Sequence, residues 1–414
     1  MPSSISTSPF SVNGRTYAPP PRPIVVICID GCADDYLSAT IARERMPNVQ
    51  RMSVDGYRGM ARSALPSFTN VNNACIASGA PPTITGISGN FFLDPETGDE
   101  VMMNAASYLR CGTILAAAAQ AGRRVAVVTA KEKLRDILSH NLKGIAFSSE
   151  KADQATLETH GIDDVERMTG ASRPEIYSAD ASLFVLRAGV ALLEQDRADF
   201  VYLSLTDYIQ HKHAPEAEES LDFCEAIDKE IGQLLNSGAV VGATADHGMN
   251  AKNKPDGTPN VIFLEQDLHR YFKQDITIIC PITDPYVVHH GALGSLVMAH
   301  LPADADIDAV AGYIMARDGI TEVYPRDVAA RKLELPADRI GDLTVLSGRD
   351  VVVGRTPDDH DLSVLSGGLR SHGGRYEEMV PMLLSEPLSN VYLTKAQGDP
   401  RNFDIFEFTC NGGQ

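Results

Sequence analysis

The chain has 414 residues, of which 36 are Lys or Arg and 55 are Asp or Glu, so its formal charge is −19. This acidity argues against a nucleic-acid or anionic-membrane partner, because both favour a basic surface. The 43% share of hydrophobic residues is ample for a large core, and the length favours two domains.

Features related to the cellular compartment predict a soluble, cytoplasmic protein. The first 22 residues are rich in Ser and Pro and lack the apolar stretch of a signal peptide. No segment approaches the ~18 apolar residues that a membrane-spanning helix needs. The cysteines are odd in number and scattered, which is typical of a reducing compartment. They are Cys28, Cys32, Cys75, Cys111, Cys224, Cys280 and Cys410. A homodimer is the default expectation for the oligomeric state.

Alternating strands and helices in the first 250 residues predict an α/β fold. Residues 1–23 are expected to form an N-terminal arm, and a short strand is expected at 59–63. Continuous apolar runs, typical of parallel strands buried on both faces, occur at 24–29, 124–129, 200–205 and 240–245. Helical segments precede the last three of these runs, at 108–122, 181–196 and 219–235. This order predicts a doubly wound, mainly parallel sheet.

The pattern changes after residue 253. Residues 254–368 have strands of their own at 276–280, 294–301 and 351–354, and an amphipathic helix at 308–317. We interpret this segment as an inserted, smaller α+β cap domain. The core would then comprise residues 24–253 and 369–414.

Carboxylates and imidazoles follow the predicted strands, where α/β proteins place their functional residues. The residues at these strand ends and in a late Gly-flanked loop are Asp30, Asp207, His211, Asp246, His247 and His372. Each has an ordinary interpretation, as a turn former, a helix cap or half of a local ion pair. Three strand ends with the same chemistry at one edge favour a site for zinc or a similar divalent ion. We interpret the remaining histidines as ordinary, and a role in the site stays open for His213, His289 and His290.

A hydroxyl nucleophile is expected in the segment 65–73. Thr69 would stand at the start of a helix, where free N–H groups stabilise an alkoxide or a phosphoryl oxygen. The alternative is that Thr69 only caps this helix. Ser67 is a weaker candidate for the nucleophile.

These residues, in this order, resemble the alkaline phosphatase superfamily and within it the nucleotide pyrophosphatase/phosphodiesterase branch. The resemblance covers the core and not the inserted segment. It implies one zinc ion held by Asp207, His211 and His372. It implies a second held by Asp30, Asp246 and His247, with Thr69 as nucleophile and further ligand.

The resemblance also implies substrate-binding residues. Asn90 matches the Asn that donates a hydrogen bond to a phosphoryl oxygen, although a turn Asn is an equal alternative. Lys131 and Lys133 match lysines that meet a substrate carboxylate, unless they are solvated lysines at a helix start. His211 is counted among the substrate contacts as well as the ligands.

Within this family the pattern is most similar to members that cleave the C–P bond of phosphonoacetate. The implied partner is thus a small anionic phosphonate, hydrolysed through a phosphothreonine. The alternative keeps the same site in a cytoplasmic phosphodiesterase or nucleotide pyrophosphatase, with Phe91, Phe92 or Tyr208 as a slot for the base. A catalytically silent metal-binding protein and a mutase are further alternatives.

Overall fold

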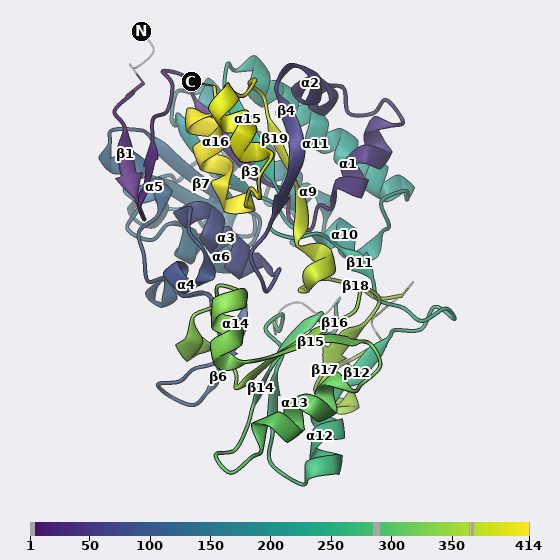
Figure 1. Ribbon diagram of the computed structural model, residues 1–414. Coiled ribbons are helices and arrows are strands. Elements are labelled where there is room, and N and C mark those ends of the chain that lie inside the picture. Colours follow the sequence, from purple (N-terminus) through teal and green to yellow (C-terminus); the bar gives the residue numbers. More distant parts are fainter. Residues whose placement is uncertain (1–4, 285–289, 364, 366–367, 414) are drawn as a thin grey trace.

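The protein consists of a larger and a smaller part, each built around its own sheet (Figure 1). The computed structural model describes residues 5–284, 290–363, 365 and 368–413. Both described chain ends lie on the larger part, at the top of Figure 1. Among the described residues, no helix has the length and apolar character needed to cross a membrane.

The larger part contains a seven-stranded, mainly parallel sheet, which confirms the predicted fold class. From one edge to the other its strands are β4 (Tyr57–Arg62), β19 (Met379–Leu384), β10 (Val240–Thr244), β3 (Ile24–Cys28), β9 (Phe200–Ser204), β7 (Val125–Thr129) and β8 (Ile145–Ser148). Only β19 runs against its neighbours. The four predicted apolar runs form β3, β7, β9 and β10, and every residue in them is buried.

Helices cover both faces of this sheet, as a doubly wound fold requires (Figure 1). One face carries α1 (Asp34–Ile41), α2 (Pro47–Asp55), α9 (Ala179–Glu194) and α11 (Glu218–Asn236). The other carries α3 (Thr69–Ser78), α5 (Ile114–Gln120), α6 (Glu132–Leu138) and α16 (Ile405–Asn411). Shorter helices are α4 (Pro82–Thr85), α7 (Leu157–His160), α8 (Val165–Thr169), α10 (Tyr208–Lys212) and α15 (Asn390–Ala396).

The helix expected at 108–122 is shorter in the structure, because α5 begins only at Ile114. Thr113 ends the preceding loop and caps the helix: its hydroxyl oxygen accepts a hydrogen bond from the Ala116 N–H at 3.1 Å. Such a cap satisfies one of the backbone donors that a helix start leaves free. The polar cap thus fixes a boundary that the hydrophobic pattern alone placed too early.

The N-terminal segment forms a hairpin that the prediction of an arm missed. Its strands are β1 (Phe10–Val12) and β2 (Arg15–Tyr17). Tyr17 is fully buried and stacks on Phe10, whose ring also meets Phe200 edge-on. The hairpin is therefore anchored in the core by aromatic packing.

The smaller part lies within the predicted insert, residues 254–368. Its antiparallel sheet has the order β13 (Thr277–Ile279), β14 (Leu296–His300), β16 (Leu343–Ser347), β15 (Ile320–Pro325). A parallel pair, β12 (Val261–Phe263) and β17 (Val352–Gly354), and the helices α12 (Leu264–Phe272), α13 (Ile307–Met315) and α14 (Arg326–Lys332) complete it. Of these, β12, β15, β16, α12 and α14 have no counterpart among the predicted elements.

Short strand pairs connect the two parts. The segments that lead into and out of the insert pair as β11 (Asn250–Ala251) and β18 (Arg370–Ser371). A hairpin of β5 (Phe91–Leu93) and β6 (Glu100–Met102) extends from the larger part, and β5 packs near β13. The insert is thus joined to the larger part by the β11–β18 pair and by the contact of β5 with β13.

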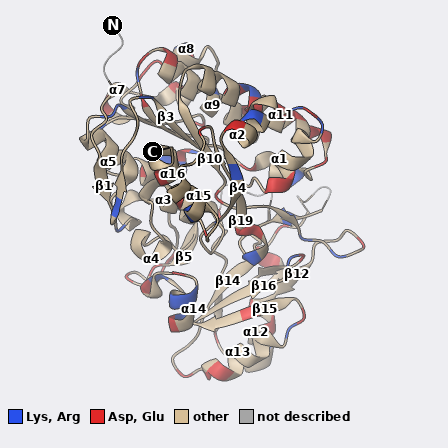
Figure 2. Ribbon diagram, turned by 45° about the horizontal axis from the view of Figure 1, so that its top comes forward, with Lys and Arg blue, Asp and Glu red and all other residues tan. Residues whose placement is uncertain are grey.

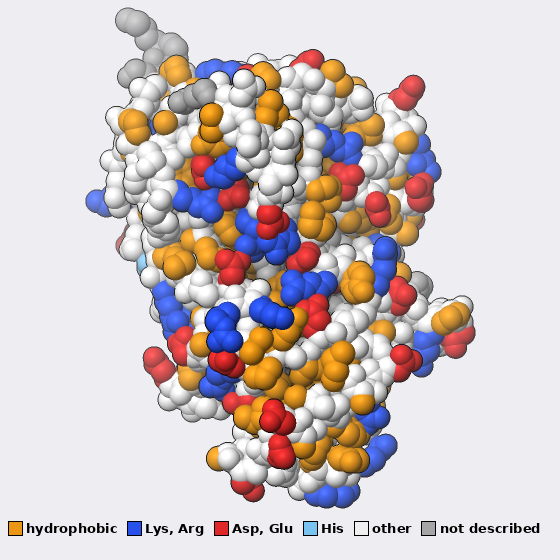
Figure 3. All heavy atoms as spheres, in the orientation of Figure 1, with side chains coloured by type: hydrophobic (Ala, Val, Ile, Leu, Met, Phe, Trp, Pro, Cys, Tyr) orange, Lys and Arg blue, Asp and Glu red, His pale blue; other side chains and the backbone are white. Residues whose placement is uncertain are grey.

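Charged side chains of both signs are interspersed over the helices and loops of both parts (Figure 2). On the face seen in Figure 3, several Lys and Arg side chains lie next to Asp or Glu, among hydrophobic and uncharged surface. Arg45, for example, forms ion pairs with Glu218, Asp222 and Glu225 on α11. Many basic groups therefore lie beside a carboxylate that offsets their charge.

Candidate metal centre and substrate cleft

The predicted metal ligands converge at one edge of the large sheet. Strands β3, β9 and β10 are parallel and in register, with Cys28 opposite both Ser204 and Thr244. Their carboxyl ends therefore meet, and the residues that follow them lie side by side. The predicted metal ligands are all buried. Besides Thr69 they are Asp30, Asp207, His211, Asp246, His247 and His372.

Two groups of these side chains have a geometry that could hold a cation. One group is Asp207, His247 and His372, and the other is Asp30, Asp246 and His247. Within each group the candidate ligand atoms lie within 4.8 Å of one another. His247 belongs to both groups, and its ring stacks on that of His372 with the centroids 3.5 Å apart.

His211 lies beside the first group. Its Nε2 is 2.9 Å from Asp207 Oδ2, and His372 Nε2 is 3.9 Å from the same oxygen. Asp207 therefore stands between these two imidazoles, as the predicted set Asp207, His211 and His372 requires. The assignment of each histidine to one of two ions stays a prediction, because His247 is within reach of both positions.

Hydrogen bonds to the backbone set the orientation of all three imidazoles. In each ring Nδ1 is the atom that donates to a carbonyl, which leaves the Nε2 lone pair for a metal. The three bonds are His211 to Arg370 O at 2.9 Å, His247 to Gly248 O at 2.9 Å and His372 to Ser67 O at 2.8 Å. The same tautomer in three separate segments is a strong indication of ligation through Nε2.

The carboxylates at the centre also fit a divalent cation. Both oxygens of Asp30 are buried, and Oδ1 lies 3.2 Å from His247 Nε2. Burial of several carboxylates at one place is costly, and a bound dication offsets this cost. Asp and His are ligands that suit zinc and related borderline ions. The residues present thus fit the metal that the sequence predicts.

The crowded carboxylates change the proton affinity of two ligands. Burial and the neighbouring Asp30 carboxylate raise the pKa of Asp246 well above its usual range. For His247, burial lowers the pKa, but Asp246 and Asp30 outweigh it and raise the pKa to about 10. In the chain alone both groups hold a proton more tightly than usual.

We therefore expect zinc binding to release protons and to strengthen as the pH rises. Asp246 and His247 must lose their protons to coordinate, so zinc affinity should increase with pH until His247 titrates near pH 10. Calorimetric titrations at pH 6, 7 and 8, in buffers of different ionisation enthalpy, measure both effects. A zinc affinity that does not change with pH would contradict this assignment of ligands.

Thr69 is the first residue of α3, as expected, and lies next to the metal groups. Its Oγ1 is 3.4 Å from His247 Nε2. One turn along the helix, Asn73 donates from Nδ2 to the Thr69 carbonyl at 3.1 Å and to Asp246 Oδ2 at 3.2 Å. Asn73 Oδ1 in turn accepts the hydroxyl of Tyr202 at 2.8 Å. Asn73 was not among the predicted site residues. Its position one helical turn after Thr69 is nevertheless a signal in the sequence that could have identified it.

A narrow cleft lies beside Thr69. It is lined by Thr69, Asn90, Lys131, Lys133, Asp207, His211, Ile282, Asp284, His290 and His372. The Asn90 Oδ1 accepts the backbone N–H of Asn70 at 3.0 Å, which leaves the Asn90 NH₂ as the group that can donate into the cleft. All the residues predicted to bind substrate thus lie in the same cleft as Thr69.

Lys131 and Lys133 are partly buried at this cleft, and the alternative of solvated lysines is wrong. Their side chains are only 12% and 16% exposed. Lys131 Nζ lies 3.3 Å from Asp207 Oδ1, and Lys133 forms an ion pair with Asp284. Burial lowers the pKa of Lys131, but Asp207 and the carboxylates nearby outweigh it and raise the pKa. Burial and the charge of Lys131 lower the pKa of Lys133.

The insert contributes three side chains that the sequence did not identify: Ile282, Asp284 and His290. His290, which the sequence left open between an ordinary histidine and a site residue, lines the cleft with its ring centroid 5.3 Å from that of His211. Burial, with the charge of His211, lowers the pKa of His290 to about 3, so it is neutral. His289 lies outside the described residues. Long-range contacts bring these residues to the site, and no local pattern marks them.

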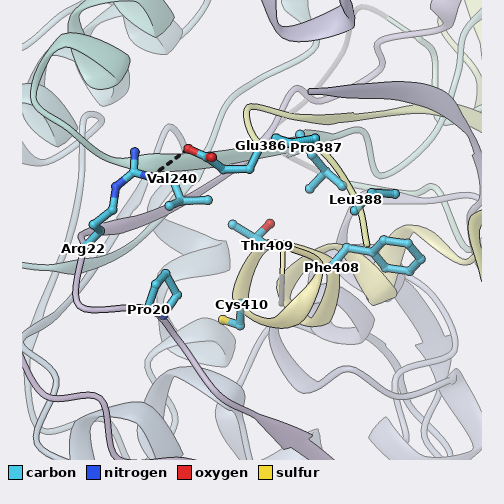
Figure 4. Close-up of a pocket in the computed structure, with 11 residues that line it drawn as sticks. Pro20, Arg22, Val240, Glu386, Pro387, Leu388, Phe408, Thr409 and Cys410 are labelled. Carbon is cyan, nitrogen blue, oxygen red and sulfur yellow. Dashed lines mark hydrogen bonds and ion pairs between the residues drawn. The ribbon is translucent and has the colours of Figure 1, made fainter. Parts of the chain in front are cut away.

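Another hollow, of about 670 Å³, lies at the amino-terminal ends of the parallel strands, away from the metal groups (Figure 4). It is bordered by Val240, the first residue of β10, and by Phe408, Thr409 and Cys410 on α16. Arg22 and Glu386 form an ion pair at its rim, 2.8 Å apart. Functional residues of open α/β sheets gather at the carboxyl ends of the strands, so the metal groups and not this hollow mark the active site.

Comparison with known proteins agrees with this site. The family of type I phosphodiesterases / nucleotide pyrophosphatases matches residues 24–375. The crystal structure of phosphonoacetate hydrolase from Sinorhizobium meliloti 1021 in complex with phosphonoformate is 44% identical, with a TM-score of 0.94, over 99% of this chain and 100% of that chain. The same enzyme in complex with phosphonoacetate matches at 43% identity and the same TM-score and coverage.

A more distant structure shares the fold. Murine ectonucleotide pyrophosphatase / phosphodiesterase 5 is 14% identical, with a TM-score of 0.62, over 94% of each chain. The family match covers most of the sequence, and the Sinorhizobium enzyme matches nearly all of it. The chain therefore belongs to the type I phosphodiesterase / nucleotide pyrophosphatase family.

Proposed function

We propose that this protein hydrolyses the C–P bond of phosphonoacetate, giving acetate and phosphate, with two zinc ions and a phosphothreonine intermediate. The observation that carries the proposal is the 44% identity, over 99% of the chain, to phosphonoacetate hydrolase from Sinorhizobium meliloti 1021. The convergence of Thr69, Lys131 and Lys133 on one cleft beside the metal groups supports it.

The protein would hold the ions through the six buried side chains predicted as ligands. The first set is Asp207, His211 and His372, and the second is Asp30, Asp246 and His247. Bound zinc supplies Lewis acidity toward the phosphoryl oxygens and lowers the pKa of a hydroxyl. The protein orients these ligands through the Nδ1 hydrogen bonds of its three histidines.

In the reaction, the Thr69 hydroxyl loses its proton and Oγ1 forms a bond to phosphorus. The C–P bond breaks, and its electron pair stays on carbon, delocalised into the neighbouring carboxylate. That carbon then takes up a proton, which yields acetate. Water cleaves the Oγ1–P bond, releases phosphate and restores Thr69.

The lysines and Asn90 stabilise the charges that this reaction develops. Lys131 and Lys133 would face the substrate carboxylate, where the electron pair of the broken bond is delocalised. The NH₂ group of Asn90 would donate to a phosphoryl oxygen. A well-placed donor of this kind is worth about 3–4 kcal/mol in the transition state.

A phosphodiesterase or nucleotide pyrophosphatase with the same site is the second candidate. A hollow of about 810 Å³, lined by Tyr177 and Ile176, shares Lys131, Lys133 and Asp284 with the cleft. Tyr177 is 39% exposed, and its ring centroid lies 6.1 Å from that of Tyr208. This aromatic pair could receive a nucleobase. Phe92, in contrast, is 3% exposed and packs against Tyr108.

A substrate panel tests the proposal. Release of phosphate and acetate is measured from phosphonoacetate, and product release is measured from bis(p-nitrophenyl) phosphate and ATP, with and without added zinc. We expect kcat/KM to be highest for phosphonoacetate. A preference for the diester or ATP would favour the second candidate, and no turnover of any substrate with zinc bound would overturn both. The homodimer and the cytoplasmic location stay predictions.

We expect the double replacement Lys131→Ala and Lys133→Ala to lower kcat/KM for phosphonoacetate by about 10²–10³-fold, since two charge-assisted contacts are lost. The loss on bis(p-nitrophenyl) phosphate should be much smaller, because its leaving group has no carboxylate. Lys151→Ala is the matched control, because Lys151 lines the neighbouring hollow but not the cleft. Equal losses on both substrates would contradict a carboxylate-binding role for the lysines.

A further inference from the structure

A fully buried ion pair lies outside the metal groups. The side chains of Lys252 and Glu377 are both 0% exposed, and Lys252 Nζ lies 2.8 Å from Glu377 Oε1. Lys252 Nζ also donates to the Arg349 carbonyl of the insert at 2.6 Å. Apolar residues often replace a buried ion pair without loss of stability, so the contacts of this pair decide whether it has a further role.

Glu377 connects the two loops that carry His247 and His372. Its carboxylate Oε2 accepts the N–H of Gly374, two residues after His372, at 3.1 Å. Its backbone carbonyl accepts the N–H of Gly248, the residue directly after His247, at 2.7 Å. The rings of these two histidines stack on each other, so the relative position of the loops sets the spacing of the ligands.

The same loop holds the nucleophile segment. The Ser67 hydroxyl donates to the Gly374 carbonyl at 3.0 Å, and the Ser67 carbonyl accepts the His372 Nδ1–H at 2.8 Å. Ser67 is two residues before Thr69. A displacement of the Gly374 loop would therefore move His372 and Thr69 together.

We propose that Glu377, with its charge balanced by Lys252, is a positioning residue that holds His247, His372 and Thr69 in the arrangement that the metal ions require. This inference rests on the proposed metal site. Glu377 acts through the backbone of the two ligand loops. Groups that orient ligands in this way typically change metal affinity by about 10–100-fold when they are replaced.

The test is the zinc affinity of the double variant Lys252→Met and Glu377→Gln, which removes both charges and keeps the length of the side chains. Zinc is removed by a chelator and titrated back against a chromophoric competitor. We expect affinity to fall by about 10–100-fold, and kcat at saturating zinc to stay below the wild-type value, because the same loop positions Thr69. A purely structural role would lower the melting temperature and leave zinc affinity unchanged.

A second buried ion pair provides the matched control. Arg123 and Asp199 are 0% and 3% exposed and lie 2.7 Å apart, just before β7 and β9, at the end of the sheet away from the metal groups. The variant Arg123→Met with Asp199→Asn should lose thermal stability and keep its zinc affinity. A similar loss of zinc affinity in this control would overturn the proposal.

A single replacement tests the role of Glu377 if the double variant does not fold. Asn250 is only half-buried, and its Nδ2 donates to Glu377 Oε1 at 2.7 Å. Asn250→Ala should weaken zinc binding by a smaller factor, with a smaller loss of kcat at high zinc. Zinc affinity equal to that of the wild type would overturn the role of Glu377. A wild-type protein that binds no zinc would instead overturn the proposed function.

Discussion

The replacement Thr69→Ala should reduce phosphate release from phosphonoacetate by about 10⁴-fold or more, because it removes the atom that attacks phosphorus. Little else should change. The Thr69 hydroxyl lies at hydrogen-bond distance only from His247 Nε2 among the contacts described, at 3.4 Å. Ala is also a favourable residue at the start of a helix. Zinc content and melting temperature should therefore stay close to those of the wild type.

The control is Thr69→Ser, which keeps the hydroxyl at the first position of α3 and should retain much of the activity. Acid quenching of the wild-type reaction, followed by peptide mass spectrometry, should find phosphate on Thr69. No such adduct should form in Thr69→Ala. Near wild-type turnover by the Ala variant would show that another group attacks phosphorus.

Removal of the metal should abolish turnover and lower the melting temperature. Asp30 and Asp246 are at most 1% exposed and lie close together, so without cations the Asp30 carboxylate disfavours the charged form of Asp246 at the centre of the fold. A ligand present at 1,000 times its dissociation constant stabilises the folded state by about 4 kcal/mol per site. Activity and thermal unfolding are measured after chelation and again after zinc is restored.

The variant Asp30→Asn separates the effect of the metal on turnover from its effect on thermal stability. It removes one of the repelling charges and a predicted ligand of the second ion. We expect it to bind less zinc, to turn over phosphonoacetate slowly and to melt at a higher temperature than the chelated wild type. Full activity in the presence of excess chelator would contradict the metal-dependent mechanism.

The acidic composition and an anionic substrate are compatible because charge is local. The protein as a whole carries −19, yet Lys131 and Lys133 face the cleft, and two dications would neutralise most of the buried acidic charge beside it. The net charge therefore describes the surface and does not exclude a small acid as substrate.

Local patterns were sufficient to predict the central strands. The runs that became β3, β9 and β10 are continuously apolar because both faces of each strand are covered by helices, and this burial is visible in the sequence itself. The candidate metal ligands were also predictable from their position relative to these strands. Asp30, Asp207 and Asp246 directly follow these strands, and parallel strands bring their carboxyl ends to one edge.

The features that could not be predicted depend on contacts between distant segments of the chain. The hairpin of residues 10–17 has strands too short for a clear alternating pattern, and aromatic packing on Phe200 stabilises it. His290 and Asp284 reach the cleft only because the insert folds against the larger part. Lys252 and Glu377 are far apart in the sequence, and neither has a local motif that marks a buried pair.

The sequence by itself determined the fold class, the nucleophile candidate and the chemistry of the ligands, because these depend on periodicity and on residues adjacent to strands. Only the tertiary structure decided how the imidazoles are oriented, which side chains of the insert line the cleft, and how Glu377 links the ligand loops. Those properties arise from hydrogen bonds and ion pairs between segments brought together by folding, such as His372 with Ser67 and Lys133 with Asp284.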